Sequence, residues 1–92
     1  MPNKVHDWTL QDDIVALYLY RYGNSPYAPS VKNVARRRGM SEASLLLRIQ
    51  NFKAIDTGSG LPNSAAQSRA AYSEHGQLSE PELRKLAFPP DQ

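Results

Sequence analysis

The chain has no cysteine, and its two histidines, His6 and His75, lie far apart in the sequence. Without thiols it can form no disulfide framework, no thiolate nucleophile and no cysteine-ligated zinc or iron–sulfur site. The histidines do not form a pair at metal-ligand spacing. We therefore expect no metal site and no cofactor.

Long hydrophobic runs are also missing. The longest apolar stretch, near residues 14–20, is far shorter than the ~20 residues that span a bilayer. The N-terminal Met-Pro-Asn-Lys leads directly into a polar segment, so we expect no signal peptide, no membrane association and a cytoplasmic location. The 92 residues suffice for one compact domain but not for two domains with a cleft between them. We expect that domain over residues 1–88, followed by a tail at 89–92.

The small net charge of +2 hides an uneven distribution. Residues 21–53 carry seven basic side chains and one acidic one, a net charge of +6, whereas residues 1–20 and 54–92 each sum to −2. A basic middle third between acidic ends is the asymmetry expected of a surface that faces a polyanion. A run such as Arg36-Arg37-Arg38 is equally compatible with a solvated helix face.

Every patterned segment indicates helix, so the expected fold class is all-α, a small bundle of about four to five helices. Residues that typically cap helices mark four helix starts: Thr9 with Asp12, Ser30, Ser41, and Ser79 with Glu82. Apolar spacing predicts helices over residues 10–22, 31–38, 42–53 and 64–74, and a short fifth helix carrying Leu83 and Leu86. The third helix has its expected core face at Leu45, Ile49 and Phe52, in i, i+4 and i+7 spacing. Because Leu46 and Leu47 make it apolar on more than one face, we expect it to be the central, most buried helix.

The segment between the second and third helices meets five requirements of a helix-turn-helix. Ala35 is small enough for a close helix crossing, and Gly39, four residues later, tolerates positive φ at the turn. Met40 is apolar and can plug the angle between the helices, Ser41 supplies a cap, and Leu45 points inward one turn later. This spacing predicts a helix-turn-helix core over about residues 30–54.

One position departs from that pattern. Arg48 stands three residues after Leu45, where such a unit usually has an apolar residue, so the second helix must be rotated or packed against different neighbours. The plain alternative is an ordinary helical hairpin with a glycine turn. The arginine cluster favours the DNA-binding interpretation.

The second helix of a helix-turn-helix enters the major groove with its amino end first, which makes double-stranded DNA the expected partner. The candidate base-reading residues are Ser41, Glu42, Ser44, Arg48 and Asn51. Of these, Ser44, Arg48 and Asn51 form a stripe that is equally the polar side of an amphipathic helix. The candidate phosphate contacts, which set affinity rather than sequence preference, are Lys32, Arg36, Arg37, Arg38 and Lys53.

A longer motif runs from Gly39 to Asp56, with Asn51-Phe52 before Asp56 and then Gly60-Leu61 as its most specific part. This motif is similar to the small N-terminal helical domain of bacterial HNH endonucleases of the restriction type, and the resemblance extends over roughly residues 8–75. It implies a DNA-binding module that helps a nuclease find its target, in some members a modified site. The chain departs from the family in having no HNH nuclease segment, and it has Ser68 and Tyr72 where relatives often have an acidic residue and Trp.

The signature residues also have a structural interpretation, which we favour. Asn51 is expected to hydrogen-bond loop backbone near residues 56–60, Asp56 to cap or turn that loop, and Phe52 to lie in the core. Asn51 is thus a candidate both for the scaffold and for base reading.

Two other function classes remain. Tyr18, Tyr20, Tyr22 and Tyr27 suggest a protein-interaction adaptor or inhibitor, although partial burial explains them more simply. We expect no enzyme and no catalytic residues, because Asp12 and Asp13 fall on opposite sides of a helix start and no nucleophile set or phosphate loop accompanies them. A nuclease or other protein supplied in trans is a further candidate partner, and the oligomeric state, monomer or homodimer, stays open.

Overall fold

The computed structural model describes residues 8–58 and 66–89. Within these ranges the secondary structure is five helices and no strand: α1 (Leu10–Tyr22), α2 (Val31–Arg38), α3 (Glu42–Thr57), α4 (Ala66–His75) and α5 (Glu80–Ala87). The all-α prediction is confirmed. The predicted segment around Gly60-Leu61 and the predicted start of the fourth helix at residue 64 lie outside the described residues.

The helix starts follow local capping chemistry. Thr9 and Ser79 each form a complete capping box with the acidic residue three positions later, and the hydroxyls of Ser30 and Ser41 accept hydrogen bonds from backbone N–H groups in their own first turns. Each cap satisfies a donor that the helix itself leaves unpaired. The four predicted starts are therefore confirmed.

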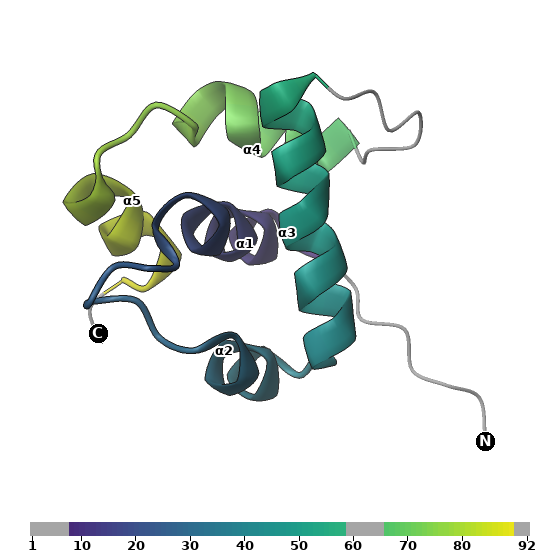
Figure 1. The fold of residues 1–92 in the computed structure, drawn as a ribbon, viewed down its shortest axis with the longest axis vertical. Coiled ribbons are helices and arrows are strands. Elements are labelled where there is room, and N and C mark those ends of the chain that lie inside the picture. The colour runs from purple at the N-terminus through teal and green to yellow at the C-terminus, as the bar shows by residue number, and fades with distance from the viewer. Residues whose placement is uncertain (1–7, 59–65, 90–92) are drawn as a thin grey trace.

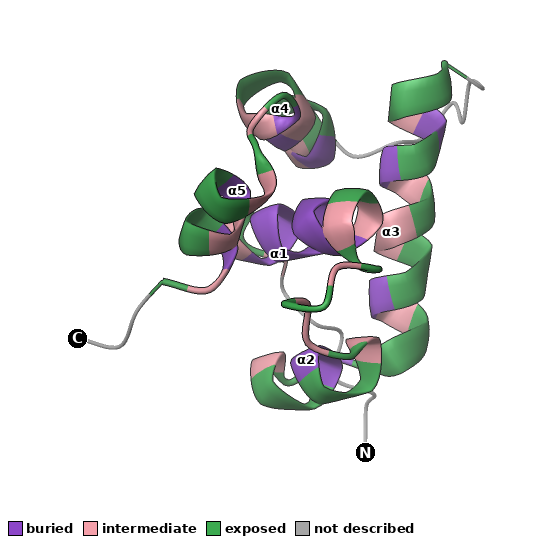
Figure 2. Cartoon of the chain, turned by 60° about the vertical axis from the view of Figure 1, so that its left-hand side comes forward, coloured by how far each residue is buried: buried purple, intermediate pink, exposed green. Residues whose placement is uncertain are grey.

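The central helix is α1, not α3. Eight consecutive residues of α1, from Asp12 to Leu19, are buried, and the helix contacts α3, α4 and α5. Figures 1 and 2 show α1 in the middle of the molecule, with α3 on one side and α5 on the other. The expectation that α3 would be the most buried helix is wrong, because its Leu46 and Leu47 are 45% and 64% exposed.

α3 packs through a narrower stripe than its composition suggests. Leu45 and Phe52 are fully buried, and Ile49 is half-buried against the same core. The helix continues four residues beyond its predicted end at Lys53, so Asp56 and Thr57 are helical rather than part of a loop. It ends at Gly58, whose φ of 67° is the left-handed conformation that favours glycine.

Candidate nucleic-acid interface

The turn between α2 and α3 is fixed by the backbone conformation of Gly39 and by two backbone hydrogen bonds. Gly39 has φ 72°, its N–H donates to the carbonyl of Arg36 at 3.3 Å, and the N–H of Met40 donates to the carbonyl of Ala35 at 3.0 Å. These two bonds form a Schellman motif, which satisfies carbonyls at the end of α2 and turns the chain sharply. Only glycine adopts the left-handed backbone there without strain.

Apolar contacts hold this turn in place. Met40 is 8% exposed, Ala35 is 2% exposed and Leu45 is fully buried, all three in the common core. Between them, Ser41 begins α3 by accepting a hydrogen bond from the N–H of Ser44 at 3.0 Å. Ala35, Met40, Ser41 and Leu45 therefore take the small, apolar, capping and inward-facing roles that the sequence predicts for them.

Most of the predicted phosphate contacts lie on the surface. Lys32, Arg36 and Arg37 are exposed on α2, and Lys53 is exposed on α3. Arg38 is different, because its guanidinium pairs with the carboxylate of Asp12, which is 2% exposed. The structure thus gives Arg38 a role inside the fold, joining the end of α2 to the start of α1.

The predicted base-reading residues also divide into exposed ones and partly buried ones. Ser41 and Glu42 are exposed at the beginning of α3. Ser44 and Asn51 are half-buried, and the Ser44 hydroxyl accepts a hydrogen bond from the Ser41 hydroxyl at 3.0 Å. The outward face of α3 is formed instead by Ala43, Leu46, Leu47, Gln50 and Lys53.

Arg48 lies inside the molecule rather than on that outward face, because it forms a two-pronged ion pair with Asp13 of α1. Its Nε donates to Asp13 Oδ1 at 2.7 Å and its Nη2 to Asp13 Oδ2 at 2.9 Å. The guanidinium also stacks over the ring of Trp8, 4.4 Å from its centroid. Only 15% of the Arg48 side chain is exposed, and none of Asp13. The prediction that Arg48 faces DNA bases does not fit this geometry.

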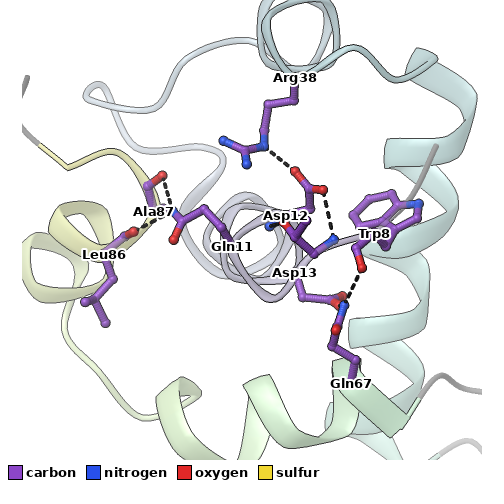
Figure 3. Close-up of polar contacts among 9 residues, drawn as sticks. Trp8, Gln11, Asp12, Asp13, Arg38, Gln67, Leu86 and Ala87 are labelled. Atoms are coloured by element: carbon purple, nitrogen blue, oxygen red, sulfur yellow. Dashed lines mark hydrogen bonds and ion pairs between the residues drawn. The ribbon is translucent and has the colours of Figure 1, made fainter.

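The remaining acceptor capacity of Asp13 is used by α4. Ser68 Oγ donates to Oδ1 at 2.7 Å, and Gln67 Nε2 donates to Oδ2 at 2.7 Å and to the Trp8 carbonyl at 3.0 Å. Figure 3 shows Asp12 and Asp13 side by side at the start of α1, with Arg38 and Gln67 reaching toward them from opposite sides. A buried carboxylate with four donors is electrostatically satisfied, so this cluster joins three helices.

The sequence contained an indication that Asp13 and Arg48 form a pair. A charged residue at an inward position of α3 requires a buried partner, and the acidic pair at the start of α1 offered one. The small Ser68 of α4 donates to Asp13 as well.

Asp56 joins α1, α3 and α4 at the opposite end of α3. It accepts hydrogen bonds from the hydroxyls of Tyr72 and of Tyr20, the latter at 2.7 Å. These bonds, Tyr72 first, hold the pKa of the Asp56 carboxyl below its ordinary value and raise the pKa of both phenols. Asp56 thus connects helices, a different role from the expected loop cap.

The tyrosines that suggested an interaction surface mostly face inward. Tyr18 is fully buried and donates to Glu80 Oε2 at 2.6 Å, and Tyr22 donates to the carbonyl of Leu78 at 2.6 Å. Burial, followed by the Glu80 contact, raises the pKa of Tyr18 to about 12. Tyr27 alone of the four is largely exposed, at 64%. The simpler interpretation, that these rings pack in a small core, is confirmed for Tyr18, Tyr20 and Tyr22.

The residues that the structure describes contain no group of three or more histidine, cysteine or acidic side chains placed to hold a metal ion. None of their helices is long and apolar enough to cross a membrane.

Comparisons with known proteins give no relative. No protein-family model matches the chain, no curated protein matches it significantly, and no solved structure does so either.

Proposed function

We propose that this chain is a non-catalytic module that binds double-stranded DNA through a helix-turn-helix formed by α2 and α3. The observation that carries the proposal is the Schellman turn at Gly39, with Met40 buried behind it and exposed cations on the helix before it. A turn of this kind fixes the angle at which the second helix projects. In DNA-binding proteins, that helix enters the major groove.

In this proposal α3 reads bases with its first two turns. Ser41, Glu42 and Ala43 are exposed at its amino end, where a major groove would receive them. Glu42 can accept from the amino group of cytosine, and Leu46 and Leu47 can contact thymine methyl groups. Arg48 takes no part, since Asp13 engages its guanidinium.

The cations of α2 contact phosphates. Lys32, Arg36 and Arg37 are exposed on the helix that crosses the DNA backbone in such units, and Lys53 adds a charge on α3. Phosphate contacts release counterions, so they provide affinity on any sequence and make binding depend strongly on salt. The resemblance to the N-terminal domain of HNH endonucleases supports the same role, with the nuclease or another protein supplied in trans, or with the chain acting as a small regulator.

The proposal is tested by fluorescence anisotropy with a labelled duplex at low salt. The variant Lys32→Ala/Arg36→Ala should weaken binding on all sequences, because both side chains are exposed and carry the phosphate term. Lys85→Ala, an exposed cation on α5, is the matched control and should leave affinity unchanged. Absence of duplex binding by the wild-type chain at low salt would reject the proposal.

A protein-interaction module is the second candidate, and the apolar outward face of α3 favours it. Leu46 and Leu47 are among the most exposed large hydrophobic side chains of the described residues, and clustered exposed leucines typically mark contact surfaces. On this alternative the wild-type chain forms a stable dimer by light scattering, Leu46→Ser/Leu47→Ser is monomeric, and neither binds duplex DNA. Duplex binding by a monomeric wild-type chain would exclude it.

A further inference from the structure

A hollow lies between α2 and α5, away from α3. It has a volume of about 440 Å³, and its apolar walls come from Tyr27, Pro29, Pro81 and Phe88. Prolines and aromatic rings lose little conformational freedom on contact, so such walls suit the binding of an apolar side chain. Three cations also line the hollow: Arg37, Arg84 and Lys85.

A second hollow adjoins the first beside α2. It has a volume of about 240 Å³ and shares Arg37 and Phe88 with the larger one. Val34, Ala87 and Pro89 supply its apolar lining. Because Arg37 and Phe88 line both hollows, the two adjoin and together form a groove between α2 and α5 that side chains of one extended chain can occupy. In an extended peptide, alternate side chains point the same way about 7 Å apart, so two of them can enter successive hollows.

The groove has an excess of positive charge. None of the described residues that line either hollow is acidic. Arg84 Nε lies 3.0 Å from Glu80 Oε2 as an ion pair without hydrogen-bond geometry, and the guanidinium stacks over the ring of Tyr27, 4.5 Å from the centroid. The stacked guanidinium supports the Tyr27 ring, which lines one side of the larger hollow. Among the described residues, Arg37 and Lys85 form no hydrogen bond or ion pair, although Lys85 lies near enough to Glu82 to help lower the pKa of that carboxyl. Carboxylates of an occupant can therefore pair with both cations, at Lys85 in competition with Glu82.

Shape distinguishes this groove from the proposed DNA surface. The outward-facing Lys32 and Arg36 of α2 do not line it, and α5 lies on the other side of α1 from α3 (Figures 1 and 2). Hollows of this size admit single side chains, whereas a duplex is far too wide to enter them. Arg37 belongs to both surfaces, so the tests below leave it unchanged.

We propose that the groove between α2 and α5 binds an extended acidic peptide segment of a partner protein. One apolar side chain of the segment enters the larger hollow between Tyr27 and Phe88, and the next enters the smaller one. Carboxylates beside them pair with Arg37 and Lys85. The proposal does not rest on the proposed DNA binding: the two surfaces share Arg37, but neither Tyr27 nor Lys85 belongs to the surface assigned to DNA.

The test is selection from a random peptide library displayed on phage, with the full wild-type chain immobilised. The comparison variant is Tyr27→Ala/Lys85→Glu, which changes one wall and one cation at exposed positions. Lys53→Glu, an equal charge reversal on α3, is the matched control. Lys85→Glu alone is the second variant, for use if far-UV circular dichroism shows that the double variant is unfolded.

The expected result is a set of enriched peptides that combine acidic residues with an aromatic, leucine or proline residue. They should bind the wild type and the Lys53→Glu chain equally, and the groove variant about tenfold more weakly. Failure to enrich peptides that discriminate the wild type from the groove variant overturns the proposal. A comparable loss of duplex DNA affinity in the groove variant also overturns it and assigns the groove to DNA. Loss of DNA binding in Lys32→Ala/Arg36→Ala with peptide binding retained separates the two proposals.

Discussion

The ion pair between Asp13 and Arg48 yields the sharpest stability prediction. Arg48→Met removes the guanidinium but keeps an unbranched apolar stem beside Trp8. Asp13 would then stay buried with only Ser68 and Gln67 as donors. Breaking a buried pair by removing one partner costs about 3–5 kcal/mol, because an uncompensated charge is left in the interior.

That loss is large for a chain of this length. A domain of 92 residues typically has a free energy of unfolding of about 5–14 kcal/mol. A loss of about 3–5 kcal/mol therefore lowers Tm by roughly 12 °C or more, since each kcal/mol shifts Tm by about 4–8 °C at this size. The variant should be measurably destabilised in both urea and heat.

The assay is far-UV circular dichroism during thermal and urea unfolding. Lys53→Met, at an exposed position of the same helix, is the control and should stay within about 0.5 kcal/mol of the wild type. The double variant Asp13→Leu/Arg48→Met should be more stable than Arg48→Met alone, because it leaves no unpaired charge. Arg48→Met with wild-type stability and altered DNA sequence preference would refute the structural role and restore Arg48 as a base-reading residue.

Three further outcomes follow from the geometry. Gly39→Ala places a Cβ on left-handed backbone at φ 72° and should lower the free energy of unfolding by about 1–2 kcal/mol in urea titrations; unchanged stability would mean the turn does not need glycine. The pKa of Tyr18 is raised to about 12, so this residue contributes stability that is present below its ordinary pKa of 10.0 and is lost as pH rises toward about 12. The loss in the free energy of unfolding amounts to about 2–3 kcal/mol. Tyr18→Phe should remove that part of the alkaline decline in Tm. Tyr72 and Tyr20 lower the pKa of the Asp56 carboxyl. Asp56 therefore contributes stability that is present above its ordinary pKa of 3.8 and is lost as pH falls through the lower pKa of the folded state. Asp56→Asn should flatten the decline of Tm at acid pH, and an unchanged decline would contradict the hydrogen bonds from the two tyrosines.

Local features of the fold were predictable from the sequence. The caps at Thr9, Ser30, Ser41 and Ser79 depend on residues three positions apart, so their chemistry is visible without tertiary information. The left-handed turn at Gly39 is local in the same sense.

The core face of α3 follows the i, i+4, i+7 apolar spacing of Leu45, Ile49 and Phe52, and these residues pack into the core as that spacing predicts. The orientation of the remaining α3 side chains could not be predicted in the same way, because Leu46 and Leu47 permit further apolar stripes. The choice depends on α1, where Asp13 binds Arg48 and turns that side of α3 inward. Ser44 and Asn51 are thereby half-buried, while Leu46 and Leu47 face outward. The turn at Gly39 and the exposed cations of α2 therefore agree with the sequence-based prediction, whereas the outward face of α3 carries Leu46 and Leu47 rather than Arg48.

The salt dependence of duplex binding tests the proposed function most directly. With four exposed phosphate-binding cations, Lys32, Arg36, Arg37 and Lys53, the logarithm of the binding constant should fall against the logarithm of salt with a slope of about −3.6, a loss of about a hundredfold between 50 and 200 mM. Lys32→Ala/Arg36→Ala should reduce the slope by about 1.8, and Lys85→Ala should leave it unchanged. A wild-type chain that shows no duplex binding at the lower salt concentration, or a slope that the α2 variant does not alter, would contradict DNA binding through this surface.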